Sequence, residues 1–149
     1  GRGSTLTVRL PLLAGAAAAR PAPQALTPIG ATTRHVLVVD DNHDAAEMLG
    51  DMVRLRGHAV TVAFDGLTAL RLNEEFRADV AVLDIGLPTM DGLELARRLR
   101  KQSGDRGIRL VAMTGYGQAS DIEASEAAGF DVHLVKPVVA ATLFEALGE

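Results

Sequence analysis

The chain has 149 residues, and 48% of them are hydrophobic, which is enough for the core of one domain plus an extra segment. The net charge of −4 argues against a general nucleic-acid surface. Cysteine is absent, which excludes a disulfide framework and a thiolate metal site and fits the reducing cytoplasm. No apolar run is long enough to span a bilayer, so we expect no membrane contact by this segment.

The N-terminal third contains a short strand pattern and a linker pattern. Residues 4–10, STLTVRL, alternate apolar and polar side chains with the period of a β-strand. Residues 10–19 imitate a secretory signal peptide, but Pro11 interrupts the apolar run and the strand pattern precedes it. Residues 14–33 are rich in Ala, Pro and Thr without periodicity, which is typical of a linker. Because the chain starts with Gly1 instead of Met, we expect it to be a fragment or a processed product.

From residue 34 to residue 149, strand patterns alternate with helix patterns. The predicted pairs are strand 35–40 with helix 43–56, strand 59–64 with helix 67–76, strand 79–84 with helix 92–101, strand 108–114 with helix 119–128, and strand 133–135 with helix 140–147. The first, third and fourth strands are nearly continuous apolar runs, as expected when helices cover both faces of a sheet. The alternation with short connections predicts an α/β fold with a doubly wound, five-stranded parallel sheet.

Polar residues follow these strands at the points where they end. Asp40 and Asp41 follow the first strand, Asp84 ends the third, Thr114 ends the fourth and Lys136 follows the fifth. Ligands of open parallel sheets bind beyond the carboxyl ends of the strands, so we expect these five side chains to meet at one edge.

Three clustered carboxylates repel one another, by about 4 kcal/mol for a pair about 4 Å apart at an effective dielectric constant of about 20. A hard dication with oxygen ligands, such as Mg²⁺, relieves that repulsion. Asp84, alone at the end of its strand, then becomes a candidate nucleophile toward a phosphoryl group. Lys136, Thr114 and the metal would neutralise charge on the transferring oxygens.

Each of these residues also has a simpler interpretation. Asp41 or Asn42 could cap the first helix. Asp84 could be an ordinary turn residue, Thr114 could simply end a strand, and Lys136 could belong to a common Lys-Pro pair. Taken together, the four correct strand ends favour the phosphoryl site.

Four segments of the sequence, VLVVDDN, DVAVLDIGLPTMDG, MTG and HLVKP, closely resemble the receiver domain of two-component response regulators in this order. The resemblance covers residues 34–149 and implies a flavodoxin-like fold with strand order 2-1-3-4-5. It implies that Asp84 accepts a phosphoryl group from a phosphohistidine of a histidine kinase or a phosphotransfer protein. It also implies that Mg²⁺ binds Asp41, Asp84 and the Gly86 carbonyl, with Asp40 acting through water.

The same resemblance assigns roles at the other strand ends. Thr114 and Lys136 would contact the phosphoryl oxygens, and the Lys136–Pro137 bond would be cis. Phosphorylation would draw the Thr114 hydroxyl toward the phosphoryl group and leave space near the fifth strand. His133 occupies the position from which a Tyr or Phe commonly moves into that space, so Thr114 and His133 are the predicted switch. His133 thus departs from the commonest pattern of the family. Gly86 departs from it as well, because it has no side chain to block or orient an attacking water.

The segment GRGSTLTVRLPL resembles the last hairpin of a histidine-kinase ATP-binding domain. If so, residues 1–13 are a kinase remnant, residues 14–33 a linker and residues 34–149 the receiver of a hybrid sensor histidine kinase. The parent kinase could be membrane-anchored. The chain itself keeps no nucleotide pocket, so we expect no autophosphorylation from ATP.

Three other functions compete with phosphoacceptance. A degenerate receiver would act only as a protein-interaction module. A phosphatase of the haloacid dehalogenase type needs a second acid two residues after its nucleophile, where this chain has Gly86. A nucleotide-binding Rossmann domain needs a Gly-rich loop after the first strand, where this chain has Asp40 and Asp41.

Overall fold

The computed structural model describes residues 33–115 and 125–148 of the chain. Five parallel strands form one sheet in the order β2-β1-β3-β4-β5, as predicted. The strands are β1 (His35–Val39), β2 (Ala59–Ala63), β3 (Val80–Asp84), β4 (Arg109–Thr114) and β5 (Val132–Val135). The helices are α1 (His43–Leu55), α2 (Gly66–Phe76), α3 (Gly92–Ser103), the short 3₁₀ helix η1 (Gly104–Arg106) and α5 (Ala140–Leu147).

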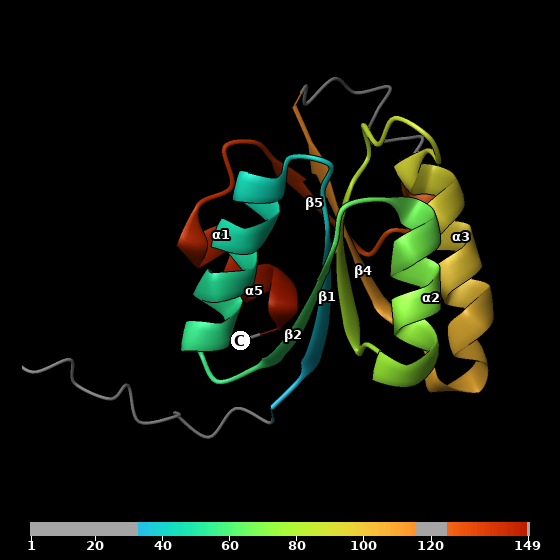
Figure 1. Cartoon of the computed structure of the whole chain (residues 1–149), viewed down its shortest axis with the longest axis horizontal. Coiled ribbons are helices and arrows are strands. Elements are labelled where there is room, and N and C mark those ends of the chain that lie inside the picture. The colour runs from blue at the N-terminus through green and yellow to red at the C-terminus, as the bar shows by residue number, and fades with distance from the viewer. Residues whose placement is uncertain (1–32, 116–124, 149) are drawn as a thin grey trace, which may run out of the picture.

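Helices cover both faces of the sheet, with α1 and α5 on one side and α2 and α3 on the other (Figure 1). Each face therefore has its own aliphatic core. Side chains of α1 and α5 pack on one face, where the buried residues include Leu49, Val53, Leu143 and Leu147. Side chains of α2 and α3 pack on the other, where they include Ala69, Leu95, Ala96 and Leu99.

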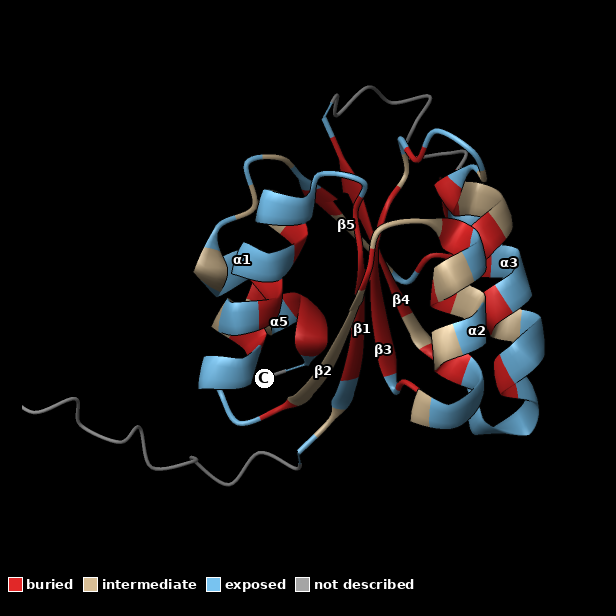
Figure 2. Ribbon diagram, in the orientation of Figure 1, coloured by how far each residue is buried: buried red, intermediate tan, exposed pale blue. Residues whose placement is uncertain are grey.

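The central strands are buried along their length, whereas the edge strand β2 is mostly half-buried (Figure 2). All five residues of β3 are buried, and so are residues 36–39 of β1. This burial explains why β1 and β3 are continuous apolar runs without alternation, as the sequence predicted.

Asparagine and aspartate side chains cap three of the helices. Asn42 Oδ1 accepts a hydrogen bond from the Ala45 N–H at 3.1 Å, so Asn42 and not Asp41 caps α1. Asp65 caps α2 by accepting from the Thr68 N–H at 2.8 Å, and this bond lowers the pKa of the Asp65 carboxyl below its usual value. Asp91 caps α3, which begins next to the end of β3. The Asp41 carboxylate is therefore not the cap of α1.

Most predicted boundaries agree with the observed ones within one or two residues, and α5 agrees at both ends. The predicted helix 119–128 lies partly outside the described residues. Of its described part, residues 125–127 are helical. The predicted kinase remnant and linker lie outside them almost entirely. Among the described residues, no helix has both the length and the apolar character needed to cross a membrane.

Candidate functional site

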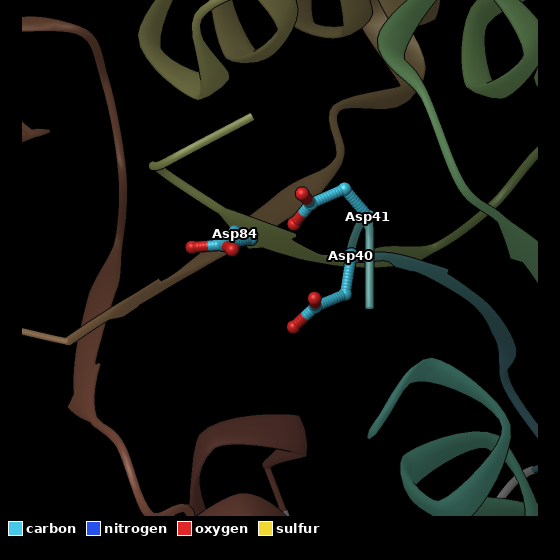
Figure 3. A group of neighbouring side chains, drawn as sticks. All are labelled: Asp40, Asp41 and Asp84. Atoms are coloured by element: carbon cyan, nitrogen blue, oxygen red, sulfur yellow. The ribbon is translucent and has the colours of Figure 1, made fainter. Parts of the chain in front are cut away.

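Three carboxylates lie together beyond the carboxyl ends of β1 and β3 (Figure 3). Asp40, Asp41 and Asp84 each present one oxygen, and these oxygens lie within 4.8 Å of one another. Asp40 is fully buried and Asp84 is 8% exposed, whereas Asp41 is open to solvent. The group could hold a cation that approaches from the exposed side at Asp41.

Lys136 joins the two buried carboxylates of this group. Its Nζ donates to Asp40 Oδ2 at 2.7 Å and to Asp84 Oδ2 at 2.9 Å. Burial by itself would lower the pKa of the Lys136 ammonium, but its hydrogen bonds with Asp40 and Asp84 outweigh burial and raise the pKa above its usual value. Lys136 is therefore a cation at neutral pH, held between the candidate nucleophile and a candidate metal ligand.

Backbone groups fix the second oxygen of each buried carboxylate. The Asn42 N–H donates to Asp40 Oδ1 at 2.9 Å, and the Gly86 N–H donates to Asp84 Oδ1 at 3.1 Å. Both carboxylates are thus oriented before any ligand arrives. Such preorganisation is what electrostatic stabilisation of a transferring group requires.

The pairing of β4 with β5 places Thr114 and Lys136 at the same edge of the sheet. Thr114 is the last residue of β4 and is 6% exposed. The Lys136 N–H donates to the Thr114 carbonyl at 2.8 Å, which carries the pairing one residue beyond the end of β5. The Lys136–Pro137 peptide bond is cis, as the resemblance implies.

The fifth strand carries His133, the predicted switch residue. Its Nδ1 lies 3.0 Å from Ser125 Oγ, and within residues 33–115 and 125–148 its buried Nε2 has no hydrogen-bond partner. Sequence reasoning missed Ser125, because a serine within a predicted helix has no signal that distinguishes it from a surface residue.

Gly92 was also missed, although it determines how closely α3 approaches the site. A Cβ added at Gly92 would clash with the Asp84 carbonyl oxygen and would lie 2.7 Å from Ile85 Cα. Both atoms belong to the backbone that carries the candidate nucleophile. In the sequence, Gly92 was only the first residue of the predicted helix 92–101, and this contact is not visible there.

We expect Gly92→Ala to lower the free energy of unfolding by about 1–3 kcal/mol, because the new methyl group forces backbone atoms apart. Urea unfolding measures this change. Gly86→Ala is the matched control, since its Cβ would lie 3.7 and 3.9 Å from the Asp84 carboxylate oxygens, which is ordinary contact. Equal losses in both variants would show that the close approach at Gly92 is not what matters.

The sheet order and the acidic group define the chain as a doubly wound α/β protein whose site lies at the carboxyl edge of the sheet. Comparison with known protein families narrows this class, because residues 36–148 match the response regulator receiver domain. The chain belongs to this family, and it is a receiver domain of two-component signalling. Membership in this family argues against the two other folds considered above, the Rossmann domain and the phosphatase of the haloacid dehalogenase type.

Curated relatives agree with this assignment. The transcriptional regulatory protein PrrA of Mycobacterium tuberculosis is 40% identical over 114 residues, which cover 76% of this chain and 48% of PrrA. The chain therefore spans about half the length of that relative. Sporulation initiation phosphotransferase F of Bacillus subtilis is 33% identical over 102 residues, which cover 68% of this chain and 81% of that protein.

Solved structures confirm the flavodoxin-like fold. The chemotaxis protein CheY4 of Vibrio cholerae superposes with a TM-score of 0.74 and 29% identity, over 78% of this chain and 98% of that one. A CheY-like receiver domain protein of Methanospirillum hungatei gives a TM-score of 0.71 and 27% identity, over 78% and 92% of the two chains.

Proposed function

We propose that this receiver domain accepts a phosphoryl group from a phosphohistidine onto Asp84. The observation that carries the proposal is the placement of Lys136 Nζ, 2.9 Å from Asp84 Oδ2, within a group of three carboxylates. A carboxylate that lies next to a fixed cation, at the carboxyl edge of the sheet, is suited to attack phosphorus. The partner is a histidine kinase or a phosphotransfer protein that presents its phosphohistidine to this edge.

In the proposed reaction, a carboxylate oxygen of Asp84 forms a bond to phosphorus while the bond from phosphorus to the histidine nitrogen breaks. The electron pair of that bond stays with the imidazole, which takes up a proton. The Lys136 ammonium compensates charge on the phosphoryl oxygens, and the Thr114 hydroxyl donates to one of them. Gly86 is exposed and has no side chain, so it leaves one side of the Asp84 carboxylate open to the donor.

The residues present fit a bound Mg²⁺. All donors in the acidic group are oxygens, which this hard cation prefers. Within the part of the chain that the structure describes, the exposed Asp41 carboxylate makes no hydrogen bond or ion pair of its own. Asp41, Asp84 and the Gly86 carbonyl would hold the ion, with Asp40 acting through water. When bound, the ion would supply positive charge to the transferring oxygens.

The proposal is tested with a small acyl phosphate and Mg²⁺, followed by mass spectrometry of the intact chain and of its peptides. One phosphoryl group should be added, stable in acid and labile in base, on the peptide that contains Asp84. Removal of Mg²⁺ with a chelator should suppress the uptake. No uptake in the presence of Mg²⁺ would instead support a degenerate receiver that acts only through protein contacts.

Asp41→Ala should weaken Mg²⁺ binding by at least about tenfold, because loss of a direct ligand should cost no less than loss of an outer-shell partner. Asp44→Ala is the matched control, since Asp44 is an exposed carboxylate in the first turn of α1. Titration with Mg²⁺ gives both affinities. Similar losses in the two variants would mean that only the general negative charge near the start of α1 attracts the ion.

For the whole chain, we propose a kinase remnant over residues 1–13, a linker over residues 14–33 and a receiver from residue 34, derived from a cytoplasmic segment of a hybrid histidine kinase. The described residues form an aliphatic core on each face of the sheet, and the first residue of these cores is Val36. Deleting residues 1–33 should therefore change the free energy of unfolding by less than about 1 kcal/mol, a small part of a typical domain's stability. Urea unfolding of both forms measures the difference, and a loss of several kcal/mol would assign the segment to the receiver fold.

A further inference from the structure

A hydrogen bond joins the helical turn that precedes Gly129 to β5. Ser125 is 1% exposed, and its Oγ lies 3.0 Å from Nδ1 of the half-buried His133. The other ring nitrogen, Nε2, is buried and has no hydrogen-bond partner among the residues that the structure describes. The imidazole is thus turned toward the interior, and the Ser125 hydroxyl is the polar contact that the described part of the chain gives it.

His133 and Thr114 lie on the same face of the sheet. In the pairing of β4 with β5, Ala112 lies opposite His133 and Thr114 lies opposite Val135. Alternate residues of a strand share a face, so Thr114 and His133 are diagonal neighbours there. Ala112 belongs to the core under α2 and α3, which places the inward imidazole on that side of the sheet.

We propose that Ser125 is a positioning residue that holds His133 inward before Asp84 is phosphorylated. This inference rests on the proposed function. In the proposed function the Thr114 hydroxyl donates to a phosphoryl oxygen, which would draw it away from its diagonal neighbour His133 and leave space for the imidazole to move further inward. In this chain the imidazole is already inward, so the movement is partly completed in advance.

The energetic reason lies in the ring nitrogens. A buried polar atom without a partner is costly, and His133 already has one such atom in Nε2. Without the Ser125 hydroxyl, Nδ1 would lose its bond as well, and the ring would turn toward water, where both nitrogens are hydrated. The hydroxyl therefore decides the resting position of the ring.

A contact that favours the inward position also favours the phosphorylated form, because the two equilibria are linked. Ser125→Ala should therefore weaken binding of beryllofluoride, a phosphoryl mimic, by about fivefold in the presence of Mg²⁺. Ser103→Ala is the matched control. Ser103 is also a buried serine near a helix end, but its hydroxyl donates to the Leu99 carbonyl at 2.9 Å, and it should leave the affinity unchanged.

A double-mutant cycle tests whether the effect acts through the imidazole. In a His133→Ala background, Ser125→Ala should no longer change the affinity for beryllofluoride. The proposal is overturned if Ser125→Ala binds as the parent does, or if the loss is just as large without His133. Failure of the proposed function has a different signature, since the unchanged chain would then neither bind the mimic nor be phosphorylated on Asp84.

The ring nitrogens of His133 give a readout that does not depend on phosphorylation. In the unchanged chain, nitrogen NMR should show His133 in one tautomer with Nδ1 in a hydrogen bond, assigned by comparison with His133→Ala. In Ser125→Ala the signals should move to those of a solvated imidazole. Solvated signals in the unchanged chain would overturn the proposal, even if the serine variant failed to fold.

Discussion

Asp84→Asn should take up no phosphoryl group, whereas the unchanged chain should take up one. The amide has nearly the shape of the carboxylate, and its oxygen can still accept from the Lys136 ammonium or from the Gly86 N–H. The fold should therefore persist while the nucleophile is lost, because a neutral amide does not attack phosphorus as a carboxylate does. Mass spectrometry after incubation with an acyl phosphate and Mg²⁺ measures the uptake.

The matched control for this variant is Asp44→Asn, which makes the same chemical change at an exposed carboxylate of α1. It should be phosphorylated like the unchanged chain. Equal labelling of Asp84→Asn would place the phosphoryl group on another residue and refute the assignment of Asp84.

Lys136→Met should have two opposite effects. Phosphorylation of Asp84 should slow by about 100-fold or more, the usual cost of removing a donor that stabilises developing charge. Mg²⁺ should bind more tightly, because a positive charge within 3 Å of Asp40 and Asp84 has been removed. Stopped-flow kinetics and Mg²⁺ titration measure the two effects separately.

A variant that was merely misfolded would lose both activities, so tighter metal binding with slower phosphorylation identifies an electrostatic role. The control is Lys101→Met, at the other lysine of the chain, which is exposed on α3. It should change neither quantity. Weaker Mg²⁺ binding in Lys136→Met would contradict the proposed balance of charges.

The raised pKa of Lys136 also predicts how its contribution to stability depends on pH. A group whose pKa is higher in the folded state stabilises the fold fully below its unfolded pKa, which is about 10.4 for lysine. That contribution is lost as the pH rises through the higher pKa of the folded state. The stability difference between the unchanged chain and Lys136→Met should therefore be constant from neutral pH to about pH 10 and shrink above it.

The architecture and most of the candidate site could be predicted from the amino-acid sequence alone. Continuous apolar runs such as residues 36–39 could be buried only in a sheet covered on both faces, and burial of this kind is visible in local composition. Parallel strands end at a common edge, so the polar residues after them had to converge. The structure does bring Asp40, Asp41, Asp84 and Lys136 together.

Contacts between segments that are distant in the chain, or whose role the sequence leaves ambiguous, could be identified only in the folded structure. Adjacent Asp41 and Asn42 were equal candidates for the cap of α1, and the path of the backbone selected Asn42. The exclusion of a side chain at Gly92 depends on how closely α3 approaches β3. The bond between Ser125 and His133 depends on how a helix end packs against β5. Periodicity shows which face of an element is buried, but the atoms that meet across that face are set by packing, to which the whole fold contributes.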